Sequence, residues 1–171
     1  MKIPFIQNYF IQKKIENLKS QNYPYHTNKI KNILLVIDES HQDYKTKIIF
    51  KIKEMGINEN NLTVLIYTQN LEKNKKYEFT TFSNESFSNF GIEKSEELIA
   101  VLNQSFDLLI TFYEDKNLLL EYIVHRIKCG FKVGLSKSQN QFFHLTVNSS
   151  LENVKIYLSE TFKYLKILNK L

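Results

Sequence analysis

Residues 106–136 read FDLLITFYEDKNLLLEYIVHRIKCGFKVGLS: an apolar run, then apolar residues at helical spacing, then a second apolar run. This order predicts a buried strand, a helix and another buried strand, the parallel βαβ unit from which open α/β sheets are built. Ligands of such sheets bind in the crevice beyond the carboxyl ends of the strands. The loop after Tyr113 is therefore the first place to look for chemistry.

The chain before this unit repeats the pattern. The apolar run ILLVIDE at 33–39 predicts a central parallel strand, and a helical pattern follows it as far as Gly56, a helix C-cap residue. NNLTVLIYTQ at 60–69 predicts the next parallel strand and completes a first βαβ unit. Further along, the sequence predicts a short strand at 77–83, a turn anchored in the core by Phe87 and Phe90, a helix at 95–104 and an edge strand at 141–148.

Amphipathic helices are expected at both ends of the chain. Residues 3–19 place Pro4 at the first helical position and set an apolar stripe opposite a basic one that includes Lys13 and Lys14. The last helix is expected to begin at a capping box formed by Ser149 and Glu152. Its predicted apolar face consists of Leu151, Val154, Leu158, Phe162, Leu165 and Leu168, and its basic face of Lys155, Lys163, Lys166 and Lys170.

The length and composition suit one domain. A chain of 171 residues with 43% hydrophobic residues can bury a single core. Together with the predicted elements, this indicates the α/β class: a single-domain, three-layer Rossmann-like sheet, mainly parallel, with N-terminal and C-terminal amphipathic helices. We divide the chain into a basic amphipathic helix with its connector, residues 1–28, and a Rossmann-like α/β domain, residues 29–171.

Several features favour a cytoplasmic protein. The apolar runs are much shorter than the roughly 20 residues of a membrane span, and the first residues do not resemble a signal peptide. Cys129 is the only cysteine, so no intrachain disulfide can form, as is usual in a reducing compartment. It stands at the end of a helical pattern and is expected to be a small buried apolar residue rather than a nucleophile.

The net charge of +5 points to an anionic partner, such as RNA or a ribonucleoprotein. The composition argues against specific recognition of nucleic acid, because Arg126 is the only arginine among 23 basic residues. Specific recognition of phosphates and bases relies on the planar guanidinium. The lysines are expected to supply a diffuse, salt-sensitive attraction.

Polar residues follow the strands at the predicted crevice. The loop after the first strand lacks glycine, which excludes a phosphate cradle of the dinucleotide or P-loop type there. Its side chains and those after the strand at 106–113 could instead ligate Mg²⁺ or supply a base. The candidates are Asp38, Glu39, His41, Asp43, Glu114 and Asp115. Alternatively, Asp43 or Ser40 caps the following helix and Asp115 caps the next one.

No other motif predicts chemistry. The histidines at 26, 41, 125 and 144 do not have metal-ligand spacing, and the sequence contains no Gly-x-Ser-x-Gly nucleophile elbow. We therefore predict no catalytic residue, metal or cofactor.

Several segments together resemble a known family. They are TTFSNESFSNFG at 80–91, FDLLITFY at 106–113, FKVGLS at 131–136 and ETFKYLKILNKL at 160–171. Across nearly the whole chain, they resemble a family of short uncharacterised flavobacterial-type proteins, a domain of unknown function. The stretch from Asp107 to Gly134 is also similar to the N-terminal Rossmann-like half of heptosyltransferase-like glycosyltransferases. Those enzymes bind the sugar nucleotide mainly in a second domain, so this resemblance implies no transferase activity for the chain alone.

Two functions stay open. The first is a non-catalytic interaction module whose basic helices bind an RNA-containing or other anionic assembly. The second is a small-molecule or nucleotide-sugar binding domain, or a Mg²⁺-assisted enzyme, that works at the crevice. We favour the first, because the terminal helices have clear basic faces whereas the crevice carries no recognisable motif.

Overall fold

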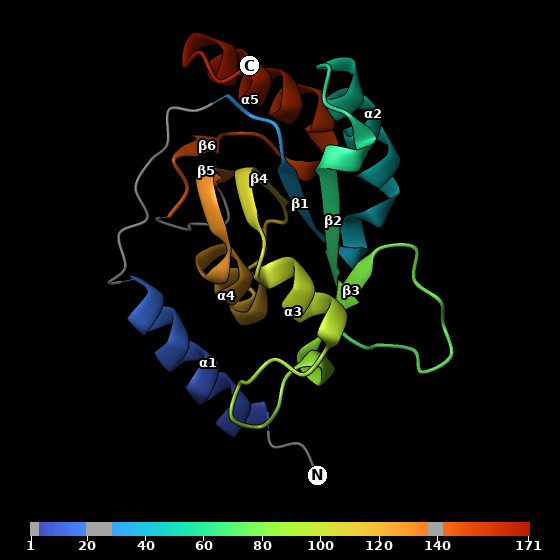
Figure 1. The fold of residues 1–171 in the computed structure, drawn as a ribbon, viewed down its shortest axis with the longest axis vertical. Coiled ribbons are helices and arrows are strands. Elements are labelled where there is room, and N and C mark those ends of the chain that lie inside the picture. The colour runs from blue at the N-terminus through green and yellow to red at the C-terminus, as the bar shows by residue number, and fades with distance from the viewer. Residues whose placement is uncertain (1–3, 20–28, 137–141) are drawn as a thin grey trace.

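The computed structural model describes residues 4–19, 29–136 and 142–171 and contains a six-stranded sheet in which all neighbouring strands are parallel. The strand order is β3-β2-β1-β4-β5-β6 (Figure 1). This is the order of a doubly wound sheet, in which the chain grows outward in one direction from β1 and in the other from β4. The strands are β1 Ile33–Asp38, β2 Leu62–Tyr67, β3 Thr80–Phe82, β4 Ser105–Phe112, β5 Lys128–Leu135 and β6 Leu145–Val147.

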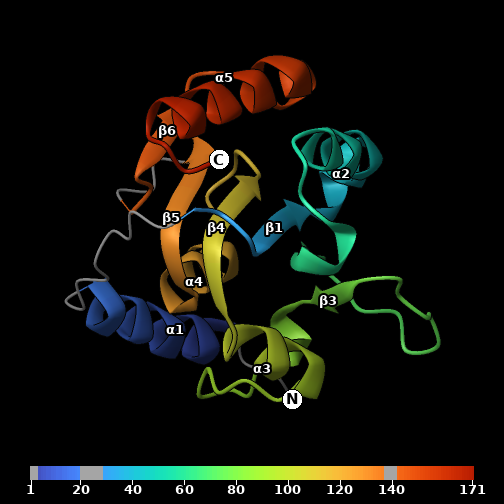
Figure 2. The same cartoon turned by 45° about the horizontal axis from the view of Figure 1, so that its top comes forward.

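Helices cover both faces of the sheet (Figure 2). One layer contains α1 Pro4–Lys19, α3 Glu96–Leu102 and α4 Leu118–Arg126, and the other contains α2 Lys45–Glu54 and α5 Val154–Ile167. The predicted α/β class is thus confirmed as a three-layer fold around one parallel sheet. Within the described ranges, no helix has the length and apolar character needed to cross a bilayer.

The sheet separates two apolar cores. In β1, Leu34 and Val36 face the layer of α1, α3 and α4, whereas Leu35 and Ile37 face α2 and α5. Because both faces of the strand are buried, its sequence is continuously apolar instead of alternating. The N-terminal helix contributes Ile11 to the first core. The connector predicted to end at residue 28 lies largely outside the described residues.

Two contacts fix α1 against the turn before α3. The buried Gln7 amide donates hydrogen bonds to the carbonyl oxygens of Asn84 (3.1 Å) and Ser88 (3.0 Å). Gly91 has a φ of 66°, and a Cβ there would lie 3.0 Å from the Ile11 side chain. A glycine at this position therefore permits both the left-handed backbone and the close approach of α1.

Three predicted core or helix positions are wrong. Phe87 is buried as expected, but Phe90 is 62% exposed and packs edge-on against Phe10 at 5.3 Å between ring centroids. Leu168, the C-cap residue just after α5, is 42% exposed. Cys129 lies in β5 instead of ending a helix, and burial raises the pKa of its thiol to about 11.

The chain reverses direction after α5 and buries Lys170, which was expected on the basic surface. Asn169 adopts a left-handed conformation with φ 54°, and the Lys170 amide donates to the Leu165 carbonyl at 2.9 Å. This pattern is a Schellman C-cap. It returns Lys170 to the sheet, where the ammonium lies 5.1 Å from the centre of the Phe131 ring and the side chain is only 1% exposed.

Candidate functional site

The doubly wound topology places its ligand crevice between β1 and β4, whose following connections leave in opposite directions. The structure brings the predicted acidic candidates to this edge. Asp38 ends β1, and Glu114 follows β4 after Tyr113. In the part of the chain that the structure describes, no three His, Cys, Asp or Glu side chains are grouped so that they could hold a metal ion.

The side chains that follow β1 make structural hydrogen bonds. Asp38 accepts from the Ser40 backbone N–H at 2.9 Å and from the Ser40 hydroxyl at 2.6 Å, so it caps the short helix at 39–44. The Glu39 carboxylate accepts a hydrogen bond from the Thr68 hydroxyl. Asp43 is exposed. The expected caps from Asp43 or Ser40 are wrong, because α2 follows the short helix directly and no side chain caps it.

The side chains that follow β4 also hold backbone in place. Glu114 accepts from the Leu151 backbone N–H at 3.0 Å. It therefore caps the helical segment that leads into α5, where the sequence predicted a Ser149–Glu152 capping box. That box does not form, since the Ser149 hydroxyl bonds to the Ser150 carbonyl. Asp115 is exposed and does not cap α4; Asn117 does, accepting from the backbone N–H of Leu119 at 2.9 Å.

Aromatic rings fill the space beside these loops on the α2 and α5 side of the sheet. Phe112, the last residue of β4, is fully buried. Its ring centroid lies 6.3 Å from that of His41, 5.7 Å from Tyr44 and 5.9 Å from Tyr157. The Tyr157 hydroxyl donates to the Thr111 carbonyl at 2.9 Å, and burial raises the pKa of this phenol. His41, the predicted candidate base, thus contributes to an aromatic cluster.

Of the two basic candidates on α1, Lys14 is bonded to other segments of the chain and Lys13 is exposed. Lys14 donates to the Gly91 carbonyl at 2.7 Å and lies 3.7 Å from the Glu93 carboxylate. Glu93 also accepts from the Tyr122 hydroxyl and lies 3.8 Å from Arg126. Burial opposes ionisation of Glu93, but these partners lower its pKa below the ordinary value. Lys14 and the only arginine therefore hold α1, α4 and the intervening loop together, while Lys13 stays exposed beside the Tyr9 ring.

The basic candidates of α5 lie on the opposite side of the sheet from those of α1 (Figure 2). Lys155, Lys163 and Lys166 are exposed, and Lys163 lies 3.2 Å from the Glu160 carboxylate. Among the described residues, Lys155 and Lys166 make no ion pair. The two terminal helices cannot form one continuous basic surface, because the sheet separates them.

The excess of positive charge is confined to one helical layer. On α1, α3 and α4, four basic residues are balanced by four acidic ones. On α2 and α5, seven lysines accompany two glutamates, an excess equal to the +5 of the whole chain. Glu78 and Glu59 pair with Lys45 and Lys53 at the ends of α2. We call the outer surface of α2 and α5 the basic face.

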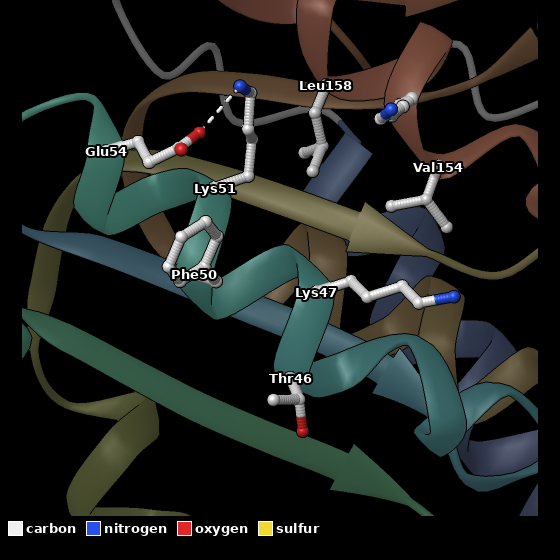
Figure 3. A pocket seen from close by; sticks show the side chains of 8 residues that line it. Thr46, Lys47, Phe50, Lys51, Glu54, Val154 and Leu158 are labelled. Atoms are coloured by element: carbon white, nitrogen blue, oxygen red, sulfur yellow. Dashed lines mark hydrogen bonds and ion pairs between the residues drawn. The ribbon is translucent and has the colours of Figure 1, made fainter.

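The basic face contains a groove between α2 and α5 with a volume of about 530 Å³ (Figure 3). It is lined by Thr46, Lys47, Phe50, Lys51, Glu54, Val154, Lys155 and Leu158. The sequence prediction missed α2 as part of a binding surface. The signal was present, since four of its ten residues are lysines.

Two buried basic side chains that the sequence did not indicate, Lys132 and His125, lie at α4. The Lys132 side chain is 4% exposed and its ammonium donates to the Val124 carbonyl in the last turn of α4. Burial lowers the pKa of Lys132 to about 8. His125 is 3% exposed and packs on the Phe142 ring at 3.8 Å between centroids. Burial, with the positive charges of Lys132 and Lys19, lowers the pKa of His125 to about 4.

We expect His125 to make the fold sensitive to acid. The folded chain keeps this imidazole neutral down to about pH 4, whereas the unfolded chain protonates it near pH 6.5. As the pH falls between these values, the free energy of unfolding should drop by up to about 3 kcal/mol. Urea denaturation of the native chain and of His125→Gln across this range measures the effect. Parallel stability profiles for the two proteins would contradict it.

The fold and site define an α/β protein with a doubly wound parallel sheet and a basic helical face. A family model matches residues 5–168, and the chain belongs to this family of unknown function (DUF6913). No curated protein and no solved structure matches the chain.

Proposed function

We propose that the chain is a non-catalytic interaction module that binds an anionic macromolecular partner through the basic face. The observation that carries the proposal is the confinement of the excess positive charge to α2 and α5. A layer with a marked excess of one sign attracts an oppositely charged surface and speeds its association. The other layer, with balanced charge, offers no comparable attraction.

The proposal differs in one respect from the expectation that both terminal helices bind the partner. The face pairs α5 with α2 in place of α1, because α1 lies beyond the sheet. RNA or a ribonucleoprotein is one partner of the required charge. The position of Arg126 argues for a partner recognised by lysines, since its guanidinium bonds to Leu102 and Asn103 on the opposite layer.

The alternative, a small-molecule or Mg²⁺-assisted site at the crevice, has weaker support. Asp38, Glu39 and Glu114 already accept hydrogen bonds that fix local structure. Asp43 and Asp115 are exposed at the surface. The resemblance to heptosyltransferase-like enzymes stays a prediction, and so does the resemblance to flavobacterial-type proteins. The cytoplasmic setting, in which the single Cys129 would stay reduced, is also a prediction.

Two double variants of equal charge test the proposal. Lys47→Glu with Lys155→Glu alters the basic face, and Lys13→Glu with Lys94→Glu alters exposed lysines outside it. Each pair lowers the net charge from +5 by four units. Fluorescence anisotropy at low salt, with labelled poly-L-glutamate and a labelled single-stranded RNA, should show salt-sensitive binding of at least one probe. The first pair should weaken that binding by about tenfold or more.

The second pair should leave affinity within about twofold of the native chain if location rather than net charge matters. Equal losses in both pairs would contradict the proposal. So would the absence of salt-sensitive binding of either probe.

A further inference from the structure

The groove of the basic face combines an apolar interior with a basic rim. Val154 and Leu158 project from α5 toward α2 and are almost completely buried (Figure 3). Phe50 on α2 lines the groove and is 62% exposed. Phe50 therefore extends the apolar lining of the groove to the surface, where a partner can contact it. An occupant with apolar side chains of its own would therefore match this lining.

The lysines of the groove can form ion pairs with carboxylates of an occupant at several points along its length. Lys47 and Lys51 are four residues apart on α2, so they lie one helical turn apart on the same side. Lys155 stands on the other wall, on α5. Lys51 already lies 2.7 Å from Glu54, whereas Lys47 and Lys155 make no ion pair among the described residues.

This spacing distinguishes between possible occupants. A small amphiphile with a single carboxylate would engage one lysine and leave the others unmatched. A helix with acidic residues four positions apart places its charges one turn apart, as the lysines of α2 are. A helix that lies in a groove presents apolar residues at i, i+3, i+4 and i+7, which suits the apolar lining.

Other macromolecules fit the groove less well. Single-stranded nucleic acid binds through stacking platforms of aromatic rings, whereas the interior here is formed by Val154 and Leu158 with one ring, Phe50. A second copy of this chain would bring the same excess of lysines against itself if it used the same face, and that arrangement is repulsive.

We propose that the groove between α2 and α5 is a docking site for an acidic amphipathic helix of a partner protein. This inference rests on the proposed function, because it assigns the partner class of the same face. Apolar side chains of the partner helix cover Phe50 and enter the groove. Its carboxylates, one turn apart, pair with Lys47 and Lys51 of α2, and another pairs with Lys155 of α5.

A selection from a random 16-residue peptide library on the native full-length chain tests the docking site. We expect enrichment of sequences with acidic residues four apart and apolar residues at i, i+3 and i+7. Anisotropy then gives the affinity of a labelled selected peptide. Phe50→Asp should weaken it by about tenfold or more, as expected for a central apolar contact.

Phe90→Asp is the matched control, because Phe90 is also 62% exposed but lies on the other layer. It should leave the peptide affinity unchanged, and circular dichroism should show both variants folded. Enrichment of no acidic amphipathic sequence, or selected peptides that bind Phe50→Asp as well as the native chain, would overturn the docking site.

The result also separates the two proposals. If the Lys47 and Lys155 variant loses binding of RNA or poly-L-glutamate while no acidic amphipathic peptide is selected, the basic face stands and the helix-docking site falls. If anionic phosphatidylserine vesicles bind the native chain and Phe50→Asp equally and no peptide is selected, the occupant is a charged surface and the docking site again falls. If no anionic probe depends on the lysines, both proposals fail.

Discussion

Phe112→Ala is expected to destabilise the protein by about 3–5 kcal/mol, the usual cost of removing a buried phenylalanine side chain. Phe112 is fully buried at the carboxyl end of β4, where its ring meets those of His41, Tyr44 and Tyr157. These surrounding rings come from two separate segments, the short helix at 39–44 and α5, so they cannot close the space without moving backbone. Urea denaturation followed by circular dichroism measures the loss.

Phe112→Leu is the matched control, since it keeps most of the apolar volume and should cost clearly less than the alanine variant. The position also bears on function. If the ring serves only as packing, the alanine variant should still bind the selected peptide when folded at low temperature. A stable Phe112→Ala protein, within about 1 kcal/mol of the native chain, would show that the cluster is not a well-packed part of the core.

Gly134→Val is expected to cost about 1–3 kcal/mol because of overpacking. Gly134 lies in β5, and a Cβ at that position would overlap the ring of Phe143. The backbone angle of Gly134 is not left-handed, so lack of space is the cause rather than strain. Thermal unfolding of the native chain and the variant provides the measurement.

A double-mutant cycle identifies the clash. Removing the ring in Phe143→Ala makes room beside β5, so the valine should be less harmful in that background than in the native chain. If the two substitutions are strictly additive, the Phe143 ring is not what requires glycine at this position.

The fold could be predicted from sequence because its main signals are local. A parallel strand covered on both faces must be largely apolar, and the buried parts of β1 and β4 contain the continuous apolar runs 33–37 and 108–110. The helix of residues 4–19 likewise follows from Pro4 and one apolar stripe. The errors concern contacts with distant segments. Lys170 is buried through a reversal at Asn169, and Phe90 lies at the surface, where it packs on Phe10 of α1.

The candidate site was harder to predict for the same reason. The acidic residues were correctly expected at the carboxyl ends of β1 and β4. Whether a carboxylate is available to a ligand depends on partners far along the chain, and Glu114 bonds to the amide of Leu151, 37 residues later. The basic face is also a tertiary feature, since α2 and α5 meet only when the sheet forms. The lysines of both helices were visible in the sequence, but their proximity in the fold was not.

The central claim is that the protein binds anionic partners on the basic face rather than in the crevice. An amide chemical-shift titration of the ¹⁵N-labelled chain with poly-L-glutamate at low salt tests it most directly. We predict that the perturbed amides cluster on α2 and α5, around Lys47, Lys51 and Lys155. Perturbations confined to residues 38–43 and 113–115, or to α1, would contradict the claim.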